Sequence, residues 1–282
     1  MTMDATVVFL VLLSALMHAA WNAMVRSGAD TLIALFLVKG PTMFVAAAVL
    51  AVVGLPSLES WPYLLASTAI TAAYFYFLTN AYRVGDLSVG YPVARGVAPV
   101  VVLLLSAAFV GERPTVSGLL GVAIISLGVL ILAWRSDARG PKPAAIFWAI
   151  GVGLTIAAYT VSDGLGGRAS GNPIGYAAVL NIMTGIVLCG AVVFLRGAEP
   201  AFASLRQWKT GLAGGVLMFG AYAVVIYALS LAPIAGVAAL RETGVIFAAI
   251  IGTLVLKEPL GARRIVASVV VAAGVVLLVV GR

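Results

Sequence analysis

Apolar runs long enough to cross a lipid bilayer recur along almost the whole chain. Of its 282 residues, 63% are hydrophobic and 10% are charged, whereas soluble domains are about half apolar and about a quarter charged. A helix needs about 20 apolar residues to span the hydrocarbon core, and lipid offers no partner to an unpaired backbone group. Because no run alternates like a barrel strand, the sequence predicts an all-α membrane protein.

Charged residues, glycines and prolines divide the apolar sequence into ten predicted transmembrane helices. Their approximate ranges are 4–26, 31–54, 62–83, 86–110, 115–134, 143–165, 172–196, 208–231, 233–256 and 264–281. The polar segment at residues 139–143 separates two sets of five, so we expect two five-helix repeats at residues 1–137 and 143–282. Because five is an odd number, the second repeat is expected to be inverted in the membrane.

Two arginines stand about ten residues inside the fourth and ninth predicted helices, where a charge is costly and usually faces a bundle interior or a wet cavity. They are Arg95 and Arg241, and an offset of 146 residues (241 − 95) relates them. The same offset relates Glu112 to Glu258, Gly128 to Gly274 and Tyr76 to Tyr222. Internal repeats with polar groups at mid-membrane are typical of transporters.

Basic residues in the connections predict the orientation of the chain. One side carries eleven of them, namely Arg26, Arg83, Arg135, Arg139, Lys142, Arg196, Arg206, Lys209, Lys257, Arg263 and Arg264, whereas the other carries three, Arg113, Arg168 and Arg282. Under the positive-inside rule the richer side is cytoplasmic. The sequence therefore predicts a multi-pass protein of the cell inner membrane with both termini in the periplasm. The net charge of +7 arises largely from these basic residues in the connections, so we attribute it to membrane topology. We therefore expect no nucleic-acid partner.

The fourth helix of each half ends at a glutamate beside a proline, at residues 111–114 and 257–259. This pattern resembles the ten-span drug/metabolite transporter (DMT) superfamily, in particular its EamA-type branch with the YddG-like amino-acid exporters. The resemblance implies helices around one central cavity, alternating access, and a scaffold role for the fifth and tenth helices. Residues 18–22 and 91–96 are also similar to a subgroup associated with phosphonate utilisation, which implies an anionic substrate.

Polar and aromatic side chains at helical spacing predict the wall of a substrate-binding cavity. A polar face of a membrane helix turns to protein or water, although helix–helix contact, an interfacial tyrosine belt or snorkelling of a lysine are alternatives. The predicted substrate-binding residues are His18, Trp21, Asn22, Lys39, Tyr74, Tyr76, Arg95, Tyr159, Asp163, Tyr222, Arg241 and Glu242. For Asp163, a further alternative to the cavity wall is a position at the end of its helix, exposed to solvent.

Cations outnumber acids among these predicted site residues. Lys39, Arg95 and Arg241 face only Glu242 and, if it is buried, Asp163. The surplus favours a substrate with a carboxylate or other anionic group, which arginine holds with two parallel hydrogen bonds. Glu242 either neutralises Arg241, its neighbour in sequence, or pairs across helices. Of the two arginines, we expect Arg241 to be the one partly neutralised by the protein and Arg95 to meet the substrate.

These features predict a secondary transporter that exports small organic solutes, above all amino acids or related metabolites. The first alternative is transport of an anionic phosphonate- or phosphate-type metabolite. An intramembrane enzyme is a distant alternative, since the single His18 has no convincing catalytic partner, and a channel fits an inverted repeat less well. No phosphate-binding glycine loop or metal-ligand spacing is present, so we expect no cofactor and no metal. We expect a monomer in the lipid bilayer.

Overall fold

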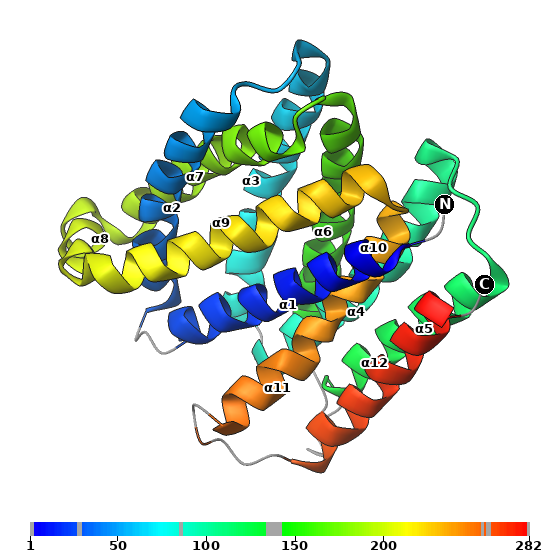
Figure 1. Ribbon diagram of the computed structural model, residues 1–282. Coiled ribbons are helices and arrows are strands. Elements are labelled where there is room, and N and C mark those ends of the chain that lie inside the picture. The colour runs from blue at the N-terminus through cyan, green and yellow to red at the C-terminus, as the bar shows by residue number, and fades with distance from the viewer. Residues whose placement is uncertain are drawn as a thin grey trace.

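The computed structural model describes residues 3–26, 30–84, 87–133, 143–254, 257 and 261–280, and these residues form helices and their connections without a strand (Figure 1). In chain order the elements are α1 (Ala5–Arg26), α2 (Thr31–Val53), η1 (Leu58–Ser60), α3 (Trp61–Val84), α4 (Leu87–Leu105), η2 (Ser106–Val110), α5 (Val116–Ile131), α6 (Pro143–Ala169), α7 (Pro173–Arg196), α8 (Ala198–Ala203), η3 (Ser204–Gln207), α9 (Trp208–Leu231), α10 (Ile234–Leu240), η4 (Arg241–Thr243), α11 (Gly244–Leu254) and α12 (Ala262–Val280). The all-helical prediction is confirmed for this part of the chain.

Eight helical segments of the described residues are long and apolar enough to cross a membrane. They are Ala5–Val25, Leu32–Val53, Gly90–Val110, Pro143–Ala169, Pro173–Arg196, Ala198–Leu231, Ile234–Leu254 and Ala262–Val280. Two further helices occupy predicted spans without meeting this criterion: α5 has 16 residues, and α3 carries tyrosines, threonines and an asparagine among its 24 residues. The number of ten spans therefore stays a prediction.

The helices α2 and α7 pack side by side, and polar contacts fasten them at both ends (Figure 1). Asp30 caps the start of α2 by accepting the backbone N–H of Leu32 at 2.8 Å, and it pairs with Arg196 at the end of α7 at 2.8 Å. At the other end, the Asn172 amide that precedes α7 donates to the carbonyl oxygen of Val53 at 2.8 Å. Since the start of each helix meets the end of the other, α2 and α7 run antiparallel.

Glycines allow α5 and α12 to approach closely at the edge of the bundle (Figure 1). A Cβ placed on Gly128 would lie 2.9 Å from the backbone nitrogen of Val271, and one placed on Gly274 would lie 2.9 Å from that of Ile125. Small residues let membrane helices approach until their backbones touch. As the residue number rises along α5, its contact on α12 falls, so these helices are antiparallel too.

We expect Gly274→Ala to destabilise the protein by about 1–3 kcal/mol, because overpacking forces a well-packed contact apart. The added Cβ would lie 2.7 Å from Cγ1 of Ile125, 2.9 Å from the backbone nitrogen of Ile125 and 3.0 Å from the backbone oxygen of Gly121. The two backbone atoms cannot rotate away as a side chain can. Equilibrium unfolding in detergent measures the change. Gly190→Ala is the matched control, since a Cβ on Gly190 meets nothing within 4 Å; equal destabilisation by the two variants would contradict the prediction.

Candidate functional site

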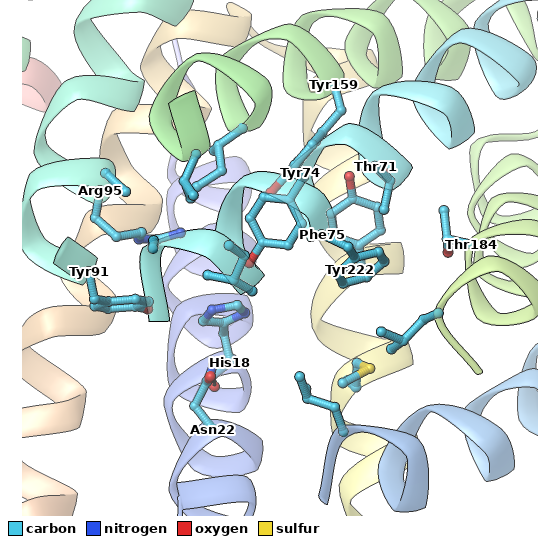
Figure 2. Close-up of a pocket in the computed structure, with 18 of the residues that line it drawn as sticks. His18, Asn22, Thr71, Tyr74, Phe75, Tyr91, Arg95, Tyr159, Thr184 and Tyr222 are labelled. Carbon is cyan, nitrogen blue, oxygen red and sulfur yellow. Dashed lines mark hydrogen bonds between the residues drawn. The ribbon is translucent and has the colours of Figure 1, made fainter. Parts of the chain in front are cut away.

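A cavity of about 230 Å³ lies between the helices of both halves (Figure 2). Its wall comes from α1, α2, α3, α4, α6, α7, α9 and η4. It reaches Ala81 in the last turn of α3 and Ala145 in the first turn of α6, so it approaches the end of the bundle at which α3 ends and α6 begins. The wall combines aromatic rings with a few polar groups, which is the usual composition of a small-molecule site.

Most of the predicted site residues line this cavity. They are His18, Trp21, Asn22, Lys39, Tyr74, Arg95, Tyr159, Tyr222 and Arg241. Asp163 and Glu242 are buried directly behind the wall, 0% and 3% exposed. The prediction that Tyr76 lines the cavity is wrong. Its side chain is 62% exposed and packs edge-on against Phe77 and Trp148 on the outside of the bundle.

Arg241 is presented at a break in its transmembrane segment. The short 3-10 turn η4 interrupts the path from α10 to α11 at this residue, and such mid-helix interruptions often mark functional sites. The guanidinium carbon of Arg241 lies 5.8 Å from the centre of the Tyr222 ring, within cation–π range. Tyr222 donates its hydroxyl to Asp163, which also accepts from Tyr176 at 3.1 Å. The described residues offer Arg241 no ion-pair partner.

Arg95 is the arginine that a protein carboxylate neutralises. Its Nε atom lies 3.1 Å from Oε2 of Glu242, and the two side chains are 10% and 4% exposed. The expectation that the protein would partly neutralise Arg241 rather than Arg95 is therefore wrong. Neighbouring residues of a helical turn point in different directions, so Glu242 turns away from the Arg241 side and meets α4 instead.

Lys39 forms a polar contact across the antiparallel pair of α2 and α7. Its Nζ atom donates to Oδ1 of Asn181 at 2.7 Å, and Lys39 is 8% exposed. Asn181 and Thr184, which both line the cavity from α7, are not among the predicted site residues. The signal was present, because they form a polar pair at helical spacing in an otherwise apolar helix.

His18 and Asn22 of α1 lie on the side of the cavity away from Tyr159 (Figure 2), and Trp21 of the same helix also lines the cavity. The rings of His18 and Trp21 meet edge-on with their centres 5.1 Å apart. Asn22 donates its amide to the backbone oxygen of His18 at 2.8 Å. The buried indole nitrogen of Trp21 has no hydrogen-bond partner within the described residues.

At the opposite end of the bundle, Glu112 lies between η2 and α5 and contacts the second half of the chain. Its Oε1 atom accepts the backbone N–H of Ile234 at 2.8 Å, and it pairs with Nη2 of Arg168 at 3.0 Å. The same guanidinium donates to the carbonyl oxygens of Leu229 at 3.1 Å and Ala232 at 2.8 Å. Glu112 thus joins the first half of the chain to the second at the start of α10. The equivalent Glu258 lies outside the described residues.

We expect Glu112→Ala to lower the free energy of unfolding by about 2 kcal/mol, because it leaves buried donors of the second half without an acceptor. Glu112→Gln retains an acceptor oxygen and loses only the charge, so its effect should be smaller. Denaturant unfolding of both variants in detergent gives the order. If Gln and Ala are equally destabilising, the ion pair with Arg168 matters and the cap on α10 does not.

Comparison with known proteins agrees with this architecture. Residues 5–134 and 143–280 each match the model of the EamA-like transporter family. One solved structure, described only as "Crystal structure of protein", superposes with a TM-score of 0.76 over 98% of this chain and 96% of that one, at 16% sequence identity. At that identity the likeness concerns the fold alone. No curated protein matches the chain.

Proposed function

Because the chain belongs to the EamA-like transporter family, we propose that it is a secondary transporter that exports small organic solutes by alternating access. The observation that carries the proposal is the central cavity. It is walled by both halves, lined by aromatic and cationic side chains, and approaches the end of the bundle at which α3 ends and α6 begins. Alternating access requires a site between two repeats that is reached from one side of the membrane at a time.

We propose further that the halves form an inverted repeat of ten transmembrane helices. Support comes from the contact of α5 with α12, in which Gly128 faces Val271 and Gly274 faces Ile125. The offset that relates Gly128 to Gly274 also relates Ile125 to Val271, so each half presents the same surface to the other. Such a self-complementary contact is characteristic of a two-fold axis, and antiparallel helices place that axis in the membrane plane.

The proposed substrates carry an acidic group, as amino acids and related metabolites do. Lys39, Arg95 and Arg241 line the cavity, and the described lining includes no aspartate or glutamate. Arginine and lysine at a partly dehydrated site bind carboxylates and phosphates. The absence of a lining carboxylate to hold an ammonium group favours the second candidate class, anionic metabolites of the phosphonate or phosphate type.

Counterflow into proteoliposomes tests the proposed function. Purified protein is reconstituted with an unlabelled organic acid or amino acid inside, and accumulation of the same labelled solute is followed. Transient accumulation that depends on the internal solute indicates a carrier. Uncoupled flux close to diffusion speed would indicate a channel instead, and formation of a product without flux would indicate an intramembrane enzyme.

We propose that both termini are periplasmic and that the cavity faces the cytoplasm. The cavity approaches the end of the bundle that carries Arg83 and Arg196, the side richer in basic residues, and the positive-inside rule assigns that side to the cytoplasm. A reporter active only in the periplasm should work when fused after Arg282 and fail when inserted at residues 134–142. The reverse pattern would overturn this topology and the direction in which the cavity opens.

A further inference from the structure

We propose that the transported substrate carries two acidic groups, which bind at two separate positions in the cavity. The first position, the lysine position, consists of Lys39 and Asn181. The second, the arginine position, consists of Arg241 and Tyr222. The inference rests on the proposed transport function and narrows its substrate to small organic diacids.

The lysine position holds a buried cation with unused binding capacity. Nζ of Lys39 has three hydrogens and donates one to Oδ1 of Asn181 at 2.7 Å. No carboxylate of the described residues forms an ion pair with it. The Asn181 amide turns its oxygen to the lysine, which leaves its NH2 group for another acceptor. An ammonium and an amide donor side by side on a cavity wall are suited to one carboxylate or phosphonate group.

Lys39 and Asn181 occupy matching depths along their own helices. Each stands at the same separation from the residue that caps its helix, Asp30 for α2 and Asn172 for α7. If this contact served only to join α2 and α7, no charge would be needed, because two amide side chains would join the helices equally well. One of two matching positions is a lysine, and the cost of burying it calls for an anion.

At the arginine position, the nearby acids Glu242 and Asp163 contact other residues and do not form an ion pair with Arg241. Glu242 contacts Arg95 at 3.1 Å, and Asp163 accepts the hydroxyls of Tyr176 and Tyr222. Arg241 therefore lines the cavity with its planar guanidinium against the Tyr222 ring. That geometry leaves the edge of the guanidinium for the second acidic group of the substrate.

The two positions lie on different walls of one cavity. Lys39 belongs to α2 beside α7, whereas Arg241 belongs to η4 beside α1. Figure 2 shows Thr184 of α7 at one side and Arg95 at the other, with Tyr74, Tyr222 and His18 between them. A substrate with one acidic group compensates one cation and leaves the other, the buried Lys39 or the half-buried Arg241, without an anionic partner, which is costly inside a membrane protein. A short diacid compensates both.

The test measures binding of four probes to the purified full-length protein by calorimetry. Succinate and phosphonoacetate have two acidic groups, succinamate has the length of succinate with one acid replaced by an amide, and alanine is a zwitterion. We expect at least one of the two diacids to bind at least tenfold more tightly than succinamate. We expect Lys39→Gln to abolish that preference by weakening the diacid at least tenfold while changing succinamate less than twofold.

Two variants control for structural effects. Lys39→Arg retains the charge and should preserve the preference for a diacid. Lys209→Gln removes an exposed lysine that lies over Trp208, away from the cavity, and should change nothing. Because the comparison of succinate with succinamate uses the unmodified protein, it remains decisive even if a Lys39 variant does not fold.

Three results would overturn the inference. Equal binding of diacid and monoacid by the unmodified protein is the first, and equal weakening of both by Lys39→Gln, which would make Lys39 a structural contact, is the second. The third is binding of neither diacid. Counterflow of alanine or succinamate alongside any of these results would leave the proposed transport function standing. Absence of counterflow for every probe and for a wider amino-acid panel would remove that function itself.

Discussion

Arg241→Gln is expected to reduce the affinity for an acidic substrate at least tenfold while leaving the fold intact. The side chain lines the cavity, and no described carboxylate lies within ion-pair distance of it. Removing one partner of a buried charged pair commonly costs about 2–5 kcal/mol of binding, and tenfold corresponds to about 1.4 kcal/mol. Calorimetry and counterflow measure the loss, with thermal unfolding recorded in parallel.

Two comparisons sharpen the test of Arg241. Arg241→Lys keeps the charge and loses the planar fork, so it should bind substrate with an affinity between those of the unmodified protein and Arg241→Gln. Tyr222→Phe keeps the ring beneath the guanidinium and removes the hydroxyl that Asp163 accepts, and it should weaken binding less than Arg241→Gln does. Unchanged affinity in Arg241→Gln would show that this arginine does not contact the substrate.

Arg95→Met is expected to act mainly on stability and to lower the free energy of unfolding by about 3–5 kcal/mol. The substitution leaves the carboxylate of Glu242, which is 3% exposed, buried without its partner. Breaking a buried ion pair by removing one side is costly, whereas replacing both sides by neutral groups is often tolerated. Denaturant unfolding in detergent, together with the yield of monodisperse protein, measures the effect.

The double variant Arg95→Met, Glu242→Gln separates pairing from other roles of Arg95. With both charges gone, no buried charge lacks a partner, so the double variant should be more stable than Arg95→Met alone. If the two variants are equally unstable, the ion pair is not the reason that Arg95 is required. If Arg95→Met folds normally and loses only substrate binding, Arg95 rather than Arg241 is the main anion-binding group.

The helical architecture and much of the cavity wall could be predicted because both depend on local sequence. Apolar runs of spanning length have few alternatives to helix in lipid, and a polar stripe at helical spacing has to face protein or water. His18, Trp21 and Asn22 were placed in this way, and they line the cavity. Asn181 and Thr184 form such a polar pair at helical spacing in α7, so the same rule predicts that they face the cavity.

The sequence did not determine which residues the charged side chains contact. Sequence neighbours in a helical segment point in different directions, so the adjacency of Arg241 and Glu242 suggested a pair that does not form, and Glu242 contacts Arg95 instead. Tyr76 lies two residues after Tyr74 and accordingly faces away from the cavity that Tyr74 lines. Periodicity relates residues of one helix and carries no information on which face of another helix they meet.

The sequence by itself determined that the chain is helical, internally repeated and rich in cations within its apolar segments. Hydropathy, the offset between the halves and the charge count all follow directly from the order of the residues. Only the tertiary structure decided which cation pairs with a carboxylate and which has no such partner among the described residues. Lys39 meets Asn181, Arg95 meets Glu242, and Arg241 meets a tyrosine ring. These contacts depend on the packing of helices that are far apart in sequence, and the electrostatic character of the cavity follows from that packing.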